Sequence, residues 1–250
     1  MTDQVQHSRQ SQRDFVVNVS HELKTPLTSI QGFAQAIKEG AVSAPEELQQ
    51  AARVIFTEAD RMHRLVLDLL DLARFESGTV SLESSPVNIA QLANNTIDRF
   101  EPQANQAQVT LERQVEDMPL LIGDGDRLAQ VVNNLVDNAI KYTPVGGQVS
   151  IIAHQVDEQA EIIVSDTGPG IPADFLPRIF ERFYQIDKSR RGGSRRGVGL
   201  GLAIAREIVL AHFGSIAVES IPPQGCQFVV KIPFAHSDDS KSIQHGKRDA

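Results

Sequence analysis

A histidine lies on the polar side of an amphipathic segment near the start of the chain. The apolar residues Val19 and Leu23 mark the buried side, and His21 is two residues from each, about 200° around a helix. Its imidazole therefore faces solvent or a partner, and a largely unprotonated ring can attack phosphorus through one nitrogen. Glu22 follows directly, and Thr25 lies one helical turn later. By position alone an ordinary surface histidine is the simpler interpretation.

A second polar face belongs to a helix predicted for residues 126–142. Asn134, Asn138 and Lys141 recur at i, i+4 and i+7, opposite the apolar residues of that helix. Amide oxygens and an ammonium group on one face can coordinate Mg²⁺ and meet triphosphate oxygens. The alternative is an ordinary solvated helix face.

Two glycine-rich segments follow this helix. Asp166 ends a predicted strand and begins the stretch 166–171, where Gly168 and Gly170 allow tight turns and close approach of the backbone to a ligand. The stretch 197–202 opens a helix predicted for 199–213, and amide groups at such a helix start can bind phosphate. No Gly-x-x-x-x-Gly-Lys-Ser/Thr pattern occurs, which argues against a P-loop.

A basic segment lies between the two glycine-rich stretches. Five basic residues surround the Gly-Gly-Ser stretch at 192–194: Lys188, Arg190, Arg191, Arg195 and Arg196. Capture of phosphate groups explains this charge. A nucleic-acid patch is the alternative, but the segment lacks interleaved aromatic residues and the chain is acidic.

Two amphipathic helices must hold His21 in place. Apolar residues at spacings of three and four predict a first helix over about 14–39 and a second that ends at Gly78. We expect Ser43 to cap the second helix, with Pro45 in its first turn and Glu46 completing a capping box. The second stripe comprises Leu48, Ala52, Ile55, Ala59, Met62, Val66, Leu69 and Ala73, and Leu65 and Leu72 widen it.

A single antiparallel hairpin leaves much of both apolar stripes in water. We therefore expect a homodimer through a four-helix bundle; the alternative is a monomeric bundle completed by the C-terminal region. Pro26 removes a backbone hydrogen bond inside the first helix, so a bend is expected just past His21.

After Pro86 the pattern becomes mixed. Helices are predicted at about 89–104, 126–142 and 199–213, and strands at about 109–114, 148–156, 160–166, 215–219 and 227–232. These elements form an α/β domain. The predicted division is a linker or helix extension over 1–13, the helical domain 14–78, a linker 79–85, the α/β domain 86–235 and a disordered polar tail 236–250.

The composition and net charge of the chain limit the partners and the compartment that we expect for it. The 250 residues are 41% hydrophobic, enough for buried cores, and the net charge of −8 gives no field for a nucleic-acid backbone. The single cysteine, Cys226, forms no internal disulfide and suits a reducing compartment. No stretch is apolar enough to span a bilayer. We expect a cytoplasmic protein, with membrane attachment only through a possible upstream segment.

Several segments resemble one family. The stretch 15–27, centred on His21-Glu22-Leu23-Lys24-Thr25-Pro26-Leu27, resembles the H-box of sensor histidine kinases. Four further segments are similar to other boxes of that family and occur in the family's order: 134–144 (N), 166–171 (G1), 179–184 (F) and 197–202 (G2). The resemblance covers residues 14–234. It departs from the family at Phe213-Gly214, where two glycines are common, and at Gly225-Cys226, where Gly-Thr is usual; these affect fine geometry only.

The resemblance implies a dimerisation and phosphotransfer domain followed by a Bergerat-type ATP-binding domain. ATP with Mg²⁺ would phosphorylate His21, and the phosphoryl group would pass to an aspartate of a response regulator. Glu22 would accept a hydrogen bond from the other ring nitrogen, and Glu22 with Thr25 would support dephosphorylation of the regulator.

The resemblance also implies the nucleotide contacts. Asn138 would be the metal ligand, Asn134 and Lys141 would contact phosphate, Tyr142 would pack near adenine, and Asp166 would accept a hydrogen bond from the adenine amino group. The other predicted ATP-binding residues lie in the G1, F and G2 boxes and beside the last of these: Gly168, Gly170, Ile171, Arg182, Phe183, Arg196, Gly197, Val198, Gly199, Leu200, Gly201 and Leu202.

Two other functions compete with this hypothesis. An ATPase of the same nucleotide fold could use ATP for conformational clamping, but such relatives lack the H-box. A non-catalytic dimeric adaptor with a decayed pocket is the other alternative. The presence of Asn138, Asp166 and the G2 glycines counts against it.

Overall fold

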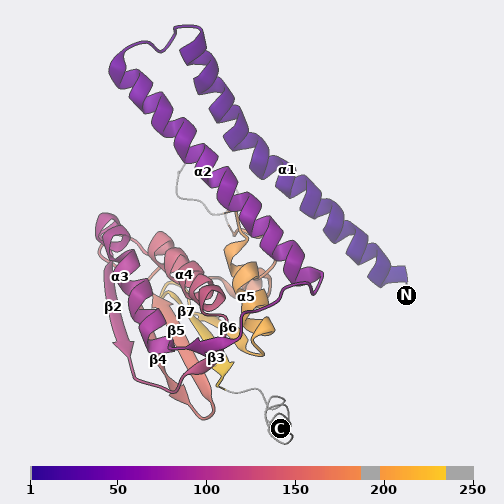
Figure 1. Cartoon of the computed structure of the whole chain (residues 1–250), viewed down its shortest axis with the longest axis vertical. Coiled ribbons are helices and arrows are strands. Elements are labelled where there is room, and N and C mark those ends of the chain that lie inside the picture. The colour runs from indigo at the N-terminus through magenta and orange to yellow at the C-terminus, as the bar shows by residue number, and fades with distance from the viewer. Residues whose placement is uncertain (1, 187–197, 235–250) are drawn as a thin grey trace, which may run out of the picture. The chain divides into compact units, whose positions relative to one another are not determined.

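The chain divides into two compact units. A computed structural model describes residues 2–186 and 198–234, with side chains from residue 15 onward (Figure 1). The first unit comprises Met1–Gly78 and Glu181–Leu200, and the second Thr79–Phe180 and Gly201–Ala250. The whole predicted basic segment, Arg196 included, lies outside the described residues, as do the neighbouring Gly197 and the polar tail. No helix within the described ranges is long and apolar enough to cross a membrane.

Two long antiparallel helices make up most of the first unit (Figure 1). Helix α1 (Thr2–Lys38) begins well before the predicted start, and α2 (Pro45–Glu76) agrees with the expected span. Each helix is followed by a glycine with positive φ, Gly40 at 74° and Gly78 at 63°. The predicted cap was wrong: Ala44, not Ser43, is the N-cap of α2, and it makes no side-chain cap. Because Pro45 takes the first helical position, the residue before it is held in the extended region.

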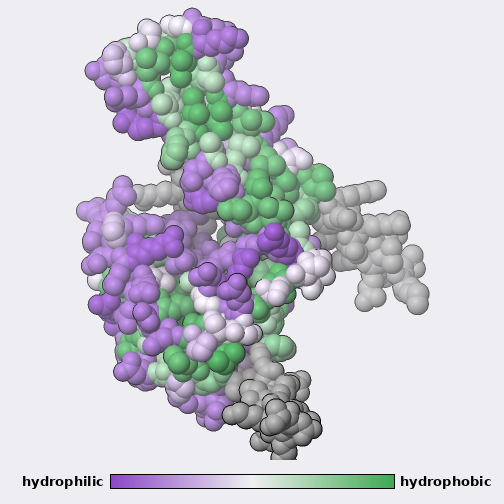
Figure 2. Space-filling view, in the orientation of Figure 1, coloured by the Kyte–Doolittle hydropathy of each residue, from purple (hydrophilic) through white to green (hydrophobic). Residues whose placement is uncertain are grey.

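The apolar surface of α2 has two sides. Leu65 and Leu72, predicted only to widen the stripe, are 2% and 1% exposed and, with Ala51, form the buried side. Val66, on the predicted stripe itself, is 43% exposed, and Val16 of α1 is 58% exposed. Figure 2 shows apolar side chains gathered along this hairpin. One hairpin therefore covers only part of its apolar surface.

As far as the structure describes it, the second unit contains a five-stranded sheet, a separate pair of short strands and three α-helices. In chain order its elements are β1 (Ser85–Val87), α3 (Ile89–Ala107), β2 (Thr110–Val115), β3 (Leu121–Gly123), α4 (Gly125–Tyr142), β4 (Gln148–Val156), β5 (Gln159–Asp166), a 3₁₀ helix (Ala173–Arg178), α5 (Gly201–Ala211), β6 (Ser215–Ser220) and β7 (Cys226–Pro233). Five strands pair in the order β2-β4-β5-β7-β6, parallel between β2 and β4 and antiparallel elsewhere. The predicted helical hairpin and α/β domain are both present, so the fold class is confirmed.

The sheet buries one face. Along β5, Ala160, Ile162 and Val164 are at most 1% exposed and alternate with half-exposed residues, and β4 and β7 follow the same rule. Helix α4 supplies the facing apolar side, where Val132 and Leu135 are fully buried. This packing leaves the opposite, polar face of α4 available for a site.

A buried histidine joins elements that the sequence patterns did not connect. His212, after α5, is 4% exposed; its Nε2 accepts from the Asp124 backbone N–H at 3.0 Å, and its Nδ1 lies 2.8 Å from the Ile208 carbonyl. Asp124 also caps α4, accepting from the Arg127 N–H at 3.0 Å. The start of α4 is therefore tied to the end of α5.

Candidate functional site

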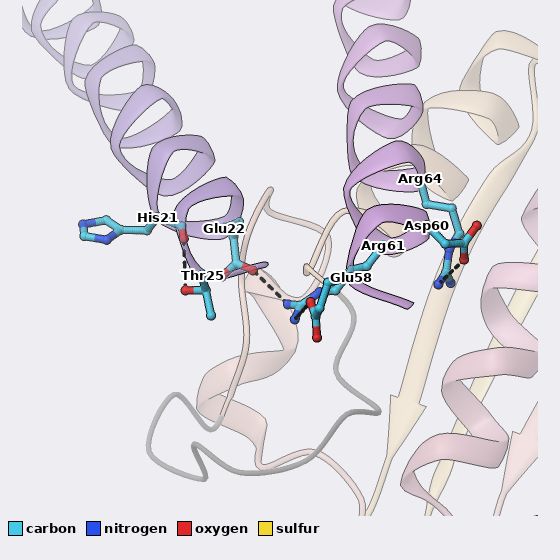
Figure 3. A network of polar contacts seen from close by, with 7 residues as sticks. All are labelled: His21, Glu22, Thr25, Glu58, Asp60, Arg61 and Arg64. Atoms are coloured by element: carbon cyan, nitrogen blue, oxygen red, sulfur yellow. Dashed lines mark hydrogen bonds and ion pairs between the residues drawn. The ribbon is translucent and has the colours of Figure 1, made fainter. Parts of the chain in front are cut away.

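His21 is exposed on α1, as its position in the amphipathic pattern predicts. Its imidazole points away from α2 (Figure 3). One turn later, the Thr25 hydroxyl donates to the His21 carbonyl over 3.4 Å, a long bond. The structure thus brings the predicted nucleophile and the predicted hydroxyl group together on one accessible face.

Glu22 points toward α2 rather than toward the imidazole (Figure 3). Its Oε2 accepts from Arg61 Nη2 at 3.4 Å. Nη1 of the same arginine lies 3.9 Å from Oε2 of Glu58. Sequence reasoning missed Arg61, because a contact across the hairpin joins residues far apart in the chain and leaves no local pattern.

Pro26 lies one turn after Glu22 and is buried, yet α1 continues through it. Proline has no backbone N–H, so the Glu22 carbonyl lacks its usual partner four residues later. The helix is weakened next to the predicted base. The expected bend at this point stays a prediction.

The polar face of α4 carries the predicted phosphate and metal contacts in the second unit. Asn134 Nδ2 donates to the Gly201 carbonyl at 3.0 Å, which leaves its Oδ1 free to accept. Asn138 is half-buried and makes no hydrogen bond to any residue that the structure describes. The Lys141 ammonium lies 5.3 Å from the centre of the Tyr142 ring, which is 57% exposed. An available amide oxygen on a sheltered face is a suitable hard ligand for Mg²⁺.

Asp166, at the end of β5, lies in a tight backbone cradle. Its Oδ1 accepts from the Gly168 N–H at 2.8 Å. Burial raises the pKa of the Asp166 carboxyl, while hydrogen bonds from the backbone N–H groups of Gly168 and Cys226 oppose the increase. A Cβ on Gly168 would lie 2.7 Å from that oxygen, so a larger residue here would displace the Asp166 carboxylate. The carboxylate is therefore oriented by backbone groups at the end of the strand.

Ser220 connects this cradle to the β6–β7 turn. Its hydroxyl accepts from the Ile171 N–H at 2.8 Å and donates to the Gly225 carbonyl at 2.7 Å. Gly225 has a φ of 93°, and a Cβ there would lie 1.8 Å from the Asp166 carbonyl oxygen. Gly170 has a φ of 72° and also borders Ser220. Sequence reasoning missed Ser220, although its position just before a Pro-Pro-Gln-Gly turn marks a strand end.

The F-box and G2 segments meet within the first unit. The Phe183 N–H donates to the Gly199 carbonyl at 2.9 Å. Gly199 has a φ of 79°, and a Cβ there would lie 2.8 Å from the Tyr184 carbonyl. Leu200 is buried, Val198 is half-buried, and the Arg182 guanidinium forms an ion pair with Glu76. Gly201 and Leu202, which begin α5, belong to the second unit and are half-buried.

Comparison with known proteins agrees with both units. Residues 11–78 match the family described as the His Kinase A (phospho-acceptor) domain, and residues 123–236 match the histidine kinase-, DNA gyrase B- and HSP90-like ATPases. Sensor protein SrrB of Staphylococcus aureus (strain MRSA252) is 34% identical over 90% of this chain, which spans 38% of SrrB. The chain therefore covers well under half the length of that relative.

Solved structures give the same result. A mycobacterial sensor histidine kinase, MprB, is 31% identical with a TM-score of 0.53, over 60% of this chain and 97% of that one. The histidine kinase ThkA, solved in complex with the response regulator protein TrrA, is 25% identical with a TM-score of 0.70, over 93% of this chain and 66% of that one. With an exposed histidine on a helical hairpin and an aspartate cradle on an α/β unit, the chain belongs to the sensor histidine kinases of two-component systems.

Proposed function

We propose that this chain is an ATP-dependent histidine kinase that phosphorylates His21 and transfers the phosphoryl group to a response regulator. The observation that carries the proposal is the accessible imidazole of His21 with Glu22 as its neighbour and Thr25 one turn away. The likeness to ThkA, which was solved with a response regulator, supports the choice of partner.

The proposed reaction is a phosphoryl transfer. A ring nitrogen of His21 forms a bond to the γ-phosphorus of ATP, the bond from that phosphorus to the bridging oxygen breaks, and ADP leaves. Glu22 accepts the hydrogen bond, and then the proton, from the other ring nitrogen. An aspartate carboxylate of the regulator next attacks the phosphorus, and the bond from phosphorus to the His21 nitrogen breaks. Glu22 returns its proton to the ring, which restores the neutral imidazole.

We propose that the second unit binds the nucleotide through α4 and the Asp166 cradle. The Asp166 carboxylate would accept a hydrogen bond from the adenine amino group, while Asn134 and Lys141 would meet phosphate oxygens. Asn138 would hold Mg²⁺, which when bound neutralises phosphate charge. The amide of Asn138, which has no hydrogen-bond partner among residues 2–186 and 198–234, supports this assignment.

We propose that two chains pair through the hairpin. The open side of the apolar surface carries Val16, Leu27 and Val66, which are 58%, 43% and 43% exposed in one chain. A second copy would cover them in a four-helix bundle. Analytical ultracentrifugation of Val66→Glu should show a monomer where the unchanged chain sediments as a dimer, and equal sedimentation would contradict this pairing.

The kinase activity is tested by labelling with γ-³²P ATP and Mg²⁺. His21→Gln should abolish acid-labile, base-stable incorporation, whereas His63→Gln, which alters another exposed histidine of the hairpin, should retain it. Calorimetric titration should show that His21→Gln still binds ATP. Acid-labile label on His21→Gln would overturn the proposal.

A phosphatase activity toward the regulator is the second part of the proposal, carried by Thr25. Thr25→Ala should retain autophosphorylation and slow the loss of phosphate from the regulator. Thr28→Ala is the matched control, because Thr28 also donates to its own helix, to the Lys24 carbonyl at 2.8 Å. Equal dephosphorylation by Thr25→Ala and Thr28→Ala would reject the role of Thr25.

A further inference from the structure

One arginine is shared by two carboxylates across the hairpin. Arg61 of α2 reaches Glu22 of α1 at 3.4 Å and Glu58 of its own helix at 3.9 Å. The Glu58 Oε2 atom is buried and has no hydrogen-bond partner in the parts of the chain that the structure describes. Arg61 at ion-pair distance is therefore its nearest compensating charge, and any movement of Arg61 changes the surroundings of both acids.

The position of Glu22 conflicts with its proposed chemistry. To accept a hydrogen bond from the His21 ring, the carboxylate must turn toward the imidazole. In the structure it turns toward Arg61, and the imidazole points the other way (Figure 3). The carboxylate is thus held in a position from which it cannot act on His21.

We propose that Arg61 is a positioning residue that restrains Glu22, so that the Arg61–Glu22 ion pair must open before Glu22 can engage His21. Glu58 weakens this restraint, because it competes for the same guanidinium. The inference rests on the proposed function of His21 and Glu22 and names an additional residue that controls that site.

The size of the effect follows from exposure. The two side chains are 32% and 31% exposed, so solvent screens the pair and its contribution is that of a surface ion pair. Opening it should therefore change a rate by about two- to fivefold, not by orders of magnitude. The weak 3.4 Å contact suits a pair that opens during each catalytic cycle.

Autophosphorylation rates, measured with Mg²⁺ over a range of ATP concentrations up to saturation, test the restraint. Arg61→Gln should speed the reaction by about two- to fivefold with an unchanged KM for ATP, and Arg61→Lys should restore the slower rate. Glu58→Gln should act in the opposite direction, because Arg61 is then left to Glu22 alone. Arg64→Gln is the matched control, since Arg64 pairs with Asp60 at 2.9 Å instead, and its rate should equal that of the unchanged chain.

Two further measurements separate restraint from a structural effect. In a Glu22→Gln background, Arg61→Gln should no longer change the rate, because the restrained carboxylate is absent. Nitrogen-15 NMR of His21 should show, in Arg61→Gln, a larger fraction of the tautomer that carries its proton on the nitrogen nearer Glu22. Thermal melting of each variant checks that the hairpin stays folded.

The outcomes distinguish this inference from the proposed function. Label on His21 with equal rates for Arg61→Gln and Arg64→Gln, and an unchanged tautomer ratio, would overturn the restraint alone. Absence of any label on the unchanged chain would instead overturn the kinase proposal, and the NMR measurement would still decide whether Arg61 controls Glu22.

Discussion

Removal of the Ser220 hydroxyl tests how the Asp166 cradle is held. In Ser220→Ala, the Ile171 N–H loses an acceptor at 2.8 Å and the Gly225 carbonyl loses a donor at 2.7 Å. The first bond joins the loop after β5 to Ser220, and the second fixes Ser220 within the β6–β7 turn. Their loss should therefore loosen the loop after β5 from the β6–β7 turn without disturbing the core of the sheet.

The magnitude follows from two partly buried hydrogen bonds. Each contributes about 0.5 to 1.5 kcal/mol net, so the free energy of unfolding should fall by about 1 to 3 kcal/mol. If the freed loop must be ordered again when the nucleotide binds, the free energy of that ordering, about 1 to 2 kcal/mol, is subtracted from the free energy of binding. ATP affinity then weakens by about five- to thirtyfold.

Urea unfolding and calorimetric titration with ATP and Mg²⁺ measure the two effects. Ser220→Thr keeps the hydroxyl and should retain most of both quantities. Ser215→Ala, at the exposed other end of β6, is the matched control and should match the unchanged chain. Our account of the cradle would be refuted if Ser220→Ala had the stability of Ser215→Ala and bound ATP within about twofold of it.

Three further predictions concern other parts of the chain. Burial, and then the Asp71 carboxylate, raise the pKa of Asp68 from 3.8 to about 6. The folded state therefore holds the Asp68 proton more tightly than the unfolded state does, and the stability of the fold that depends on this proton is lost as pH rises through 6. Asp68→Asn should therefore stabilise the hairpin at pH 7.5, by about 1 kcal/mol after allowance for solvent screening, and have little effect near pH 3.5, as thermal melts at the two pH values would show. Asp166→Asn should keep the fold, since an amide oxygen can still accept from Gly168, but weaken ATP binding by about tenfold or more in calorimetry, because the amide group presents a donor to the adenine amino group. Leu135→Ala empties a fully buried position of α4 and should lower the free energy of unfolding by about 2 to 5 kcal/mol in urea titration.

Long amphipathic elements could be predicted from the sequence because their periodicity is repeated many times. The spans of α2 and α4 follow from apolar spacing alone, and β4 and β5 follow from alternation. The two strands β1 and β3 could not be predicted, since three residues carry no period and their pairing joins Ser85 to Gly123.

Contacts between residues that are distant in the sequence could not be predicted either. The exposure of His21 follows from its place on the helix, whereas the link from Arg61 to Glu22 depends on how two helices pack. The cap of α2 could not be predicted correctly because two local rules competed, and Pro45 outweighed the capping box expected at Ser43. The role of Ser220 could not be predicted because it depends on contact between the end of β6 and the loop after β5.

The parallel pairing of β2 with β4 has a consequence for the order of folding. Adjacent parallel strands cannot be joined by a tight turn, and the chain between Val115 and Gln148 passes through β3 and α4 before it returns. Closing that loop costs conformational entropy, and the packing of α4 on the sheet offsets this cost. The helix that carries Asn134 and Asn138 must therefore be packed for this edge of the sheet to form. Half of the proposed nucleotide site would then be built as a by-product of folding, before any nucleotide is present.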